Sequence, residues 1–236
     1  MKIDIITTGA HVTPESVKNT TVIVIDVLRA TSVIISALKN GAKSVVPVTS
    51  VEEALETKKK LENVILGGER KAQKIEGFEL SNSPLEYGST AVHDKNVILT
   101  TTNGTHAISR SGAANKVYIG ALLNAKAVSE KVAAEENDVV IVNSGTNGNF
   151  SMDDFIASGA VIEEMLNIRD YELTDVAKTA LLIYRTHQDF LSYIREASHY
   201  KVLMNLGLEE DIRFCLQKDL YDIVPEYKNG IIKLNF

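Results

Sequence analysis

Several features that are common in other proteins are scarce or missing in this 236-residue chain. It has one cysteine, Cys215, which excludes an internal disulfide and fits a reducing compartment. No apolar stretch approaches the roughly 18 residues that a transmembrane helix needs. Residues 1–12 lack a basic region followed by a long apolar run, so we expect no signal peptide. These absences predict a cytoplasmic protein without a membrane partner.

Positive charge is scarce as well. The chain has 25 Lys and Arg residues against 31 Asp and Glu residues, which gives a formal net charge of −6. Because no dense group of Lys and Arg offsets this charge, the sequence disfavours a nucleic-acid partner. The acidic residues are spread along the chain rather than collected in a tail. A hydrophobic content of 44% with 24% charged residues is typical of a soluble globular enzyme.

What the chain does contain is a buried-strand pattern that ends at a charged residue. The β-branched apolar run 22–25 is followed by Asp26, Arg29, Thr31 and a helical pattern over 32–38. Such a run predicts a buried parallel strand, and ligands bind beyond the carboxyl ends of such strands. A carboxylate beside an arginine suits a hard metal ion and an anionic substrate. The alternative is that Asp26 caps the next helix while Arg29 covers the surface.

Strand–loop–helix units recur along the chain and predict its fold. Residues 23–54 resemble residues 98–128, in an alignment that places Asp26 opposite Thr100, and a third unit follows at 138–166. Alternating strands and helices predict the α/β class, here a three-layer α/β/α fold built from repeated βα units around a parallel-rich sheet. Right-handed crossovers would then place every βα loop along one edge of that sheet.

The sequence shows no sharp domain boundary. We therefore expect a single α/β catalytic domain over 1–236, with two similar lobes at about 1–95 and 96–236 as an alternative description. Residues 69–90 show little periodicity and many turn residues, and a connection of this length is usually functional. From residue 171 onward the pattern is mainly helical.

Four predicted loops at strand ends share acids, arginines and small hydroxyl or amide residues: 26–31, 67–70, 100–105 and 143–154. The third loop offers consecutive hydroxyls and backbone N–H groups that suit an oxyanion, with an ordinary N-cap as the alternative. Glu69 and Arg70 repeat the acid–arginine pairing of the first loop, although such a pair alone is typical of a surface. Asp153 and Asp154 either approach the cleft or cap a helix.

Together these loops fit Mg2+-assisted hydrolysis of a phosphate monoester. Mg2+ prefers a few carboxylates with water and substrate oxygens, and arginines stabilise charge on the phosphate. The candidate metal ligands are Asp26, Glu69 and Asp154. The candidate catalytic residues are Asp26, Arg29 and Arg70, and the candidate substrate-binding residues are Thr31, Thr101, Thr102, Asn103, Gly104, Thr105, Asn143 and Ser144. Attack by a metal-activated water and attack by an Asp carboxylate both stay open.

Other well-known motifs are missing. No Gly-x-Gly-x-x-Gly follows the first long strand, and no Walker loop is present. Leu28 stands where a haloacid-dehalogenase-like phosphatase has its second Asp, and no Cys-x5-Arg loop occurs. The five histidines show no zinc-ligand spacing. We expect Cys215, His187 and His199 to be core or surface residues rather than catalytic groups.

Six segments, in this order, resemble the 2-phosphosulfolactate phosphatase family: VIVIDVLRATSVI, GGER, ELSNSP, LTTTNGT, NSGTNGNFSMDD and EDIRFCLQKD. The resemblance runs from about Val22 to Pro225. It implies a three-layer α/β/α fold and a Mg2+-dependent enzyme that hydrolyses (2R)-2-phospho-3-sulfolactate to sulfolactate and phosphate, a step of coenzyme M biosynthesis. The implied partner is a small phosphorylated, sulfonated hydroxy acid, and we expect a homodimer.

One loop departs from the family pattern. Many members carry arginines in the fourth loop, where this chain has Thr146 and Asn149. If those arginines hold the sulfonate, the specificity of this protein has changed while its hydrolytic residues remain. Two alternatives therefore stay open: a phosphatase of the same mechanism acting on another small phosphomonoester, and a non-catalytic protein that binds a phosphorylated metabolite.

Overall fold

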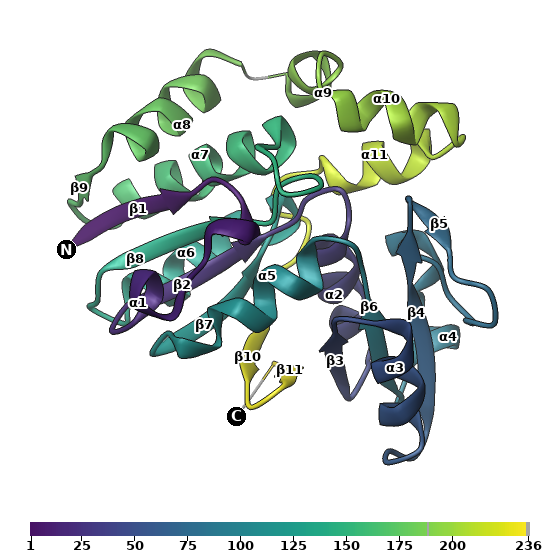
Figure 1. Ribbon diagram of the computed structural model, residues 1–236. Helices are drawn as coiled ribbons and strands as arrows, with labels where there is room; N and C mark the ends of the chain where they lie inside the picture. Colours follow the sequence, from purple (N-terminus) through teal and green to yellow (C-terminus); the bar gives the residue numbers. More distant parts are fainter. Residues whose placement is uncertain (188, 235–236) are drawn as a thin grey trace.

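The computed structural model describes residues 1–187 and 189–234, and its strands form one large sheet (Figure 1). The strands of this part of the chain are β1 (Lys2–Ile6), β2 (Thr21–Ile25), β3 (Ser44–Val48), β4 (Val64–Arg70), β5 (Gln73–Lys74), β6 (Asn96–Thr100), β7 (Lys116–Gly120), β8 (Val139–Asn143), β9 (Glu172–Leu173), β10 (Glu226–Lys228) and β11 (Ile231–Lys233). The order across the described sheet is β5-β4-β6-β3-β11-β10-β7-β2-β8-β1-β9.

The α-helices alternate with these strands along most of the chain. Their bounds are α1 (Pro14–Val17), α2 (Ala30–Lys39), α3 (Val51–Lys58), α4 (Ser89–Val92), α5 (Gly104–Arg110), α6 (Ala125–Ala133), α7 (Met152–Leu166), α8 (Asp175–Thr186), α9 (Phe190–Ile194), α10 (Ser198–Asn205) and α11 (Glu209–Cys215). The expected helix-rich region after residue 171 is confirmed by α8 to α11. No helix in the described residues is both long and apolar enough to span a bilayer.

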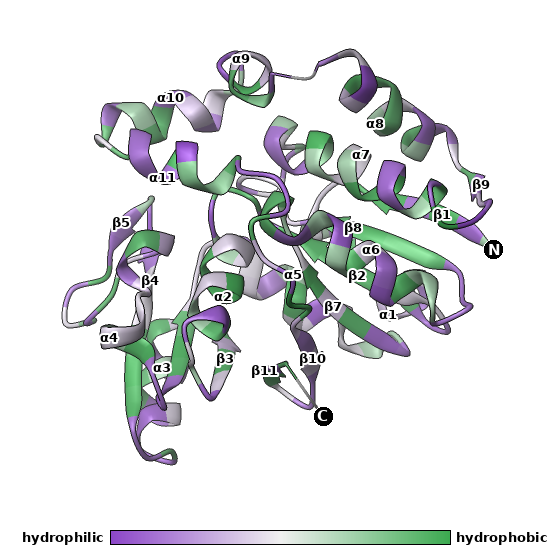
Figure 2. Ribbon diagram, turned by 180° about the vertical axis from the view of Figure 1, so that it is seen from behind, coloured by the Kyte–Doolittle hydropathy of each residue, from purple (hydrophilic) through white to green (hydrophobic). Residues whose placement is uncertain are grey.

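Helices cover both faces of the sheet because both faces of its central strands are apolar. In β2, Ile23 and Ile25 pack into one core with residues of α6 and α7. Val22 and Val24 point the other way and pack into a second core with α2 and α5. In Figure 2 the buried strand β8 is strongly hydrophobic, whereas hydrophilic residues interrupt the covering helices. This arrangement confirms the expected three-layer α/β/α class.

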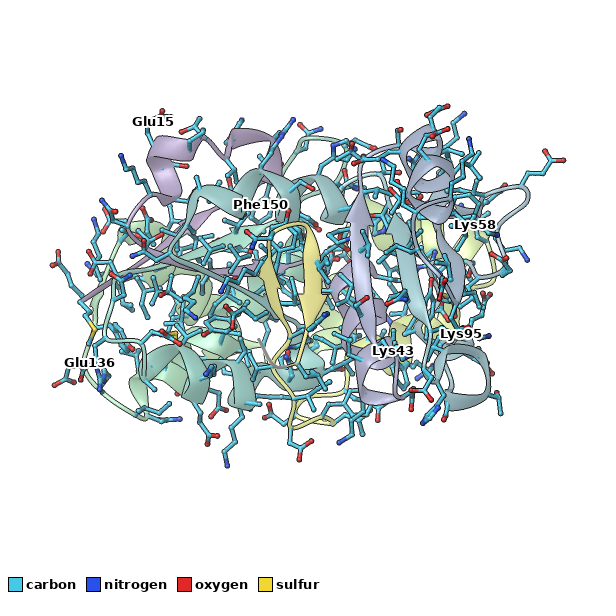
Figure 3. All side chains as sticks on the ribbon, turned by 90° about the horizontal axis from the view of Figure 1, so that it is seen from below. Glu15, Lys43, Lys58, Lys95, Glu136 and Phe150 are labelled. Atoms are coloured by element: carbon cyan, nitrogen blue, oxygen red, sulfur yellow. The ribbon has the colours of Figure 1, made fainter. Side chains whose placement is uncertain are left out.

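The C-terminal hairpin divides the sheet into two parallel groups. Strands β4, β6 and β3 are parallel to one another, as are β7, β2, β8 and β1. Between the groups, β11 pairs antiparallel with β3, β10 with β11, and β10 with β7. From below, the yellow hairpin lies in the middle of the sheet, and the labelled Glu15, Lys58 and Glu136 lie at the rim (Figure 3).

Three successive antiparallel pairings mean that the two parallel groups do not share one strand direction. The expectation that every βα loop lies along one edge therefore holds within each parallel group, but the hairpin prevents one continuous edge across both groups. The pairing also mixes chain segments from before and after residue 95, since β2 lies between β7 and β8, and β6 lies between β3 and β4. The division of the chain into one domain or two lobes stays a prediction.

Candidate active site

Loops that follow strands of both parallel groups meet at one cavity of about 660 Å3, which α10 covers on one side. Its wall combines anionic, cationic, neutral polar and apolar side chains: Asp26, Leu28, Arg29, Glu69, Arg70, Lys71, Ala72, Asn82, Thr101, Thr102, Asn103, Thr146, Asn147, Ser198, His199, Val202 and Leu203. Seven of the predicted site residues therefore reach one cavity, although they come from three separate loops.

The first loop holds Asp26 rigidly at the end of β2. The Thr31 hydroxyl accepts a hydrogen bond from the Asp26 N–H (3.0 Å) and donates one to the Asp26 carbonyl (2.8 Å). The Ala30 N–H donates to Asp26 Oδ1 (3.1 Å). A Cβ on Gly104 would lie 2.5 Å from Asp26 Oδ2, so only glycine allows this approach. Thr31 and Gly104 were both predicted to bind substrate. Neither lines the cavity, and both instead fix the position of Asp26.

Asp26 belongs to a group of three buried acids. The pKa of Asp26 is raised to about 6, mainly by burial and to a smaller extent by the nearby Asp153 carboxylate, against hydrogen bonds that lower it. Burial, followed by the charges of Asp153 and Asp26, raises the pKa of Asp154 well above its usual value. The three carboxylates repel one another, an unfavourable arrangement that a bound cation would relieve.

The fourth loop is tied to the first through Asp154. Its carboxylate accepts hydrogen bonds from the Val27 N–H (2.9 Å), from a backbone N–H of the fourth loop (3.0 Å) and from the Ser144 hydroxyl (3.2 Å). Asn143 Oδ1 accepts from the Ser158 hydroxyl (2.6 Å), while Asn143 Nδ2 has no hydrogen-bond partner within the described part of the chain. Asn143, Ser144 and Asp154 lie behind the cavity wall and support it.

Glu69 joins the second and third loops. Its two carboxylate oxygens accept hydrogen bonds from the backbone N–H groups of Thr102 and Ala72, both at 2.7 Å. Arg70 donates to the Glu69 carbonyl (2.7 Å) and to the Thr100 hydroxyl (3.0 Å). Glu69 therefore fixes the loops around the cavity, and Arg70 presents a half-buried guanidinium to it.

The third loop repeats the hydrogen bonds of the first. The Thr105 hydroxyl accepts from the Thr101 N–H and donates to the Thr101 carbonyl, both at 3.1 Å. The Thr105 N–H donates to Thr101 Oγ1, also at 3.1 Å. The residue equivalent to Asp26 is therefore Thr101, and the alignment of Asp26 with Thr100 is wrong by one position.

Two further residues of the third loop face the cavity. The Oγ1 atom of Thr102 is buried and has no hydrogen-bond partner among the described residues. Asn103 Oδ1 accepts a hydrogen bond from the Asn147 N–H (3.0 Å), which connects the third loop to the fourth. This region offers hydrogen-bond donors without a net charge, as the sequence predicted.

Arg29 is buried, with 2% of its surface exposed, so the alternative that it covers the surface is wrong. Its guanidinium forms an ion pair with Asp211 of α11 and donates a second hydrogen bond to the Ala72 carbonyl (3.0 Å). The Ser83 hydroxyl donates to the other oxygen of Asp211 (2.7 Å). This buried chain orients the Arg29 guanidinium at the cavity wall.

Two of the three predicted metal ligands, Asp26 and Glu69, line the cavity, and the third, Asp154, does not. Among the described residues, no three His, Cys, Asp or Glu side chains gather in a way that could hold a metal ion, so Asp26, Glu69 and Asp154 do not form such a group. Mg2+ also binds through one or two carboxylates, with water and phosphate oxygens completing its shell. Asp26 lines the cavity beside two repelling acids and fits an ion held in this way.

The cavity also contains residues that the sequence did not reveal. His199 lies in its wall, with Nε2 3.0 Å from the Leu28 carbonyl oxygen, rather than in the core or on the outer surface. Lys71 and Asn82 come from the aperiodic connection 69–90, and the available signals were its length and, for Asn82, the ELSNSP segment. Cys215 is a core residue as expected, and burial raises the pKa of its thiol to about 12.

Comparison with known proteins gives a consistent result. The sequence model of the family described as 2-phosphosulpholactate phosphatase matches residues 7–230. A protein from Clostridium beijerinckii is 56% identical over 98% of this chain and 99% of its own length, and one from Clostridium perfringens strain SM101 is 52% identical over 99% and 96%. A Clostridium tetani protein is 52% identical over 99% and 100%. All three are named "Probable 2-phosphosulfolactate phosphatase".

Proposed function

This chain belongs to the 2-phosphosulfolactate phosphatase family, and we propose that it hydrolyses (2R)-2-phospho-3-sulfolactate to (2R)-3-sulfolactate and phosphate in a Mg2+-dependent reaction. The observation that carries the proposal is one cavity in which the Asp26 carboxylate lies among three cationic side chains, those of Arg29, Arg70 and Lys71. Such a wall suits a substrate with more than one anionic group.

Each part of the wall has a proposed role. Asp26 would hold Mg2+, which would supply charge neutralisation at the phosphate oxygens and a more acidic bound water. Arg29 would bind the phosphate, because the Asp211 ion pair fixes its guanidinium before the substrate arrives. The Thr102 hydroxyl and other donors of the third loop would bind the remaining phosphate oxygens. Hydrolysis breaks the bond between phosphorus and the ester oxygen, and water supplies the hydroxyl for phosphate and the proton for the alcohol.

Arg70 would bind the second anionic group of the substrate. Its guanidinium is half-buried and lies beside the exposed Lys71, so it is less rigidly fixed than Arg29. We expect Arg70→Ala to raise KM for a sulfonated substrate and to have little effect on a substrate without that group. Steady-state kinetics on both kinds of substrate measures this difference. Equal losses on both substrates would place Arg70 at the phosphate.

A second candidate is a phosphatase for another small phosphomonoester. The cavity volume falls within the range of about 300–1,000 Å3 that is typical of pockets for larger organic ligands. One side of the wall is apolar: Leu28, Ala72, Val202 and Leu203. Thr146, which stands where many family members carry arginine, also lines the cavity. These features favour a substrate with an uncharged part.

A substrate panel separates these functions. Phosphate release would be measured with 2-phosphosulfolactate, 2-phospholactate, aliphatic phosphomonoesters and p-nitrophenyl phosphate, each with Mg2+ and with EDTA. We expect the highest kcat/KM on 2-phosphosulfolactate and loss of turnover in EDTA that returns with added Mg2+. Preference for an aliphatic ester would favour the second candidate, and binding without phosphate release from any ester would identify a non-catalytic binding protein.

Three further points concern the pathway, the cellular location and the oligomeric state of the enzyme. We propose a role in coenzyme M biosynthesis, which the family resemblance implies, together with a cytoplasmic location and a homodimer. Light scattering of the purified protein measures the oligomeric state, and a monomer would contradict the last of these three points.

A further inference from the structure

The side chain of Asn82 is a buried amide without a partner at the wall of the cavity. The residue is 5% exposed and lines the cavity. Its Oδ1 atom is out of contact with solvent and accepts no hydrogen bond from the residues that the structure describes. Asn82 lies in the connection between β5 and α4, within the ELSNSP segment, and the proposed catalytic roles do not use it.

The position of Asn82 is fixed by its neighbour. The Ser83 hydroxyl donates to Asp211, and Asp211 pairs with the Arg29 guanidinium. Upstream, the Leu80 backbone donates to the Leu66 carbonyl (3.0 Å) and accepts from the Gly68 N–H (3.2 Å), which anchors the segment to β4. The backbone on both sides of Asn82 is therefore held, and its amide stays in the same cavity wall as Arg29.

An unpartnered buried amide is unfavourable in the unliganded protein. A buried polar group without a hydrogen bond is destabilising, so an apolar residue of similar size would be preferred here on stability alone. Rotation about the terminal side-chain torsion exchanges Oδ1 and Nδ2 at little cost. The Nδ2 group is not among the buried side-chain atoms without a partner, and it is the donor that can bind an anionic oxygen in the cavity.

We propose that Asn82 binds an anionic oxygen in the organic part of the substrate, its carboxylate or its sulfonate, and thereby determines specificity. The inference rests on the proposed phosphatase function. Asp26 is the carboxylate suited to the metal and hence to the phosphate, whereas Asn82 reaches the cavity from a different segment. A neutral amide in the same wall as a guanidinium suits an oxyacid group, because both supply N–H donors and neither carries a negative charge that would repel it.

The test uses Asn82→Ala and the shape-conserving Asn82→Asp, with Asn205→Ala on the exposed end of α10 as the matched control. Four substrates separate the two possible groups: 2-phosphosulfolactate, 2-phospholactate with the carboxylate only, 2-phosphoethanesulfonate with the sulfonate only, and p-nitrophenyl phosphate with neither. Steady-state kinetics and thermal unfolding without ligand would be measured for every variant, and calorimetric binding of sulfolactate for the wild type and Asn82→Ala.

We expect Asn82→Ala to raise KM for 2-phosphosulfolactate about tenfold, the loss typical of one hydrogen bond to a charged group, with kcat retained. The increase in KM should persist on the single-acid substrate that keeps the group bound by Asn82. It should be absent on p-nitrophenyl phosphate, which has neither group. Asn82→Asp should raise KM further because a carboxylate repels the anion. The Tm of unliganded Asn82→Ala should equal or exceed that of the wild type, whereas a structural amide would lower it.

Three results separate the inference from the proposed function. Equal KM and equal sulfolactate affinity in Asn82→Ala and the wild type would overturn the inference alone. Wild-type protein that binds 2-phosphosulfolactate without releasing phosphate would overturn the proposed function alone, and the loss of sulfolactate affinity in Asn82→Ala would still support the inference. A wild type that binds neither compound would overturn both.

Discussion

The turn after β2 and the turn after β6 are built alike but carry different side chains. In each turn a threonine hydroxyl makes two hydrogen bonds with the residue at the strand end: it accepts one from the N–H and donates one to the carbonyl. The threonine is Thr31 after β2 and Thr105 after β6. The strand-end residue is Asp26 in one turn and Thr101 in the other. The threonine fixes the backbone in both turns, so the strand-end side chain is available for chemistry, charged in one and neutral in the other.

The surroundings of the two turns differ as much as their side chains. Asp26 lies with two other buried acids, and burial raises its pKa to about 6. Thr101 is neutral, and its neighbour Thr102 donates its N–H to the buried Glu69 carboxylate, so this turn has one buried acid beside it instead of a group of three. The same local motif therefore supports a charged side chain in the turn after β2 and neutral hydrogen-bond donors in the turn after β6. The charged copy is the less stable of the two without a cation.

We expect the largest effect when the charge of Asp26 is removed. Asp26→Asn should lower kcat by about 10³-fold or more, because the amide cannot supply the charge that Mg2+ requires. Thr101→Val, the matched change in the other turn, should lower kcat by less than about tenfold, since it removes one neutral group. Steady-state kinetics with saturating Mg2+ measures both. Near-normal turnover of Asp26→Asn, with its fold confirmed by circular dichroism, would contradict the assignment.

The next effect concerns Arg29, which exists only in the charged turn. Arg29→Ala should lower kcat by about 10²-fold and destabilise the protein by roughly 3–5 kcal/mol, because Asp211 remains buried without its partner. The double variant Arg29→Ala with Asp211→Ala should recover stability but not turnover. Urea unfolding and kinetics on the three proteins separate the two roles. Recovery of turnover in the double variant would show that Arg29 is structural only.

We expect a smaller effect, on the free energy of unfolding, when the shared threonine hydroxyl is removed from either turn. Thr31→Val and Thr105→Val keep the side-chain shape and remove the same pair of hydrogen bonds, at Asp26 and at Thr101. Each should lower the free energy of unfolding by about 2 kcal/mol, since a buried N–H is left without a partner. Chemical denaturation measures both losses. A difference of more than about 1 kcal/mol between them would show that the shared hydrogen bonds do not contribute alike.

The smallest effect is a pH dependence of the charged turn. The pKa of Asp26 is raised in the folded protein, so the folded state binds this proton more tightly than the unfolded state. The contribution of Asp26 to stability must therefore increase as the pH falls through about 6 toward the unfolded value. In EDTA, lowering the pH from about 7.5 to 5.5 should stabilise the wild type by about 1 kcal/mol more than Asp26→Asn. Equal pH profiles would contradict the raised pKa.

The sequence alone determined the individual βα units. The β-branched run before Asp26 and the helical pattern after it produce β2 and α2, and the third predicted unit at 138–166 corresponds to β8 and α7. The loops with acids, arginines and hydroxyls were predicted as the site, and Asp26, Arg29, Glu69 and Arg70 all reach the cavity. These features follow from residues close together in the chain, whose periodicity and polarity are visible without the fold.

The relative orientation of those βα units is visible only in the tertiary structure. The hairpin of β10 and β11 has three residues in each strand, too few for a periodic pattern, yet it separates the two parallel groups. The partners Arg29 and Asp211 lie 182 residues apart, and His199 reaches the cavity from a segment with no motif. Asn82 lies in the ELSNSP segment, but nothing in the local pattern of that segment predicts that it lines the site. Contacts of this kind depend on packing between distant segments, which leaves no local signal in the sequence because each residue alone is ordinary for its element.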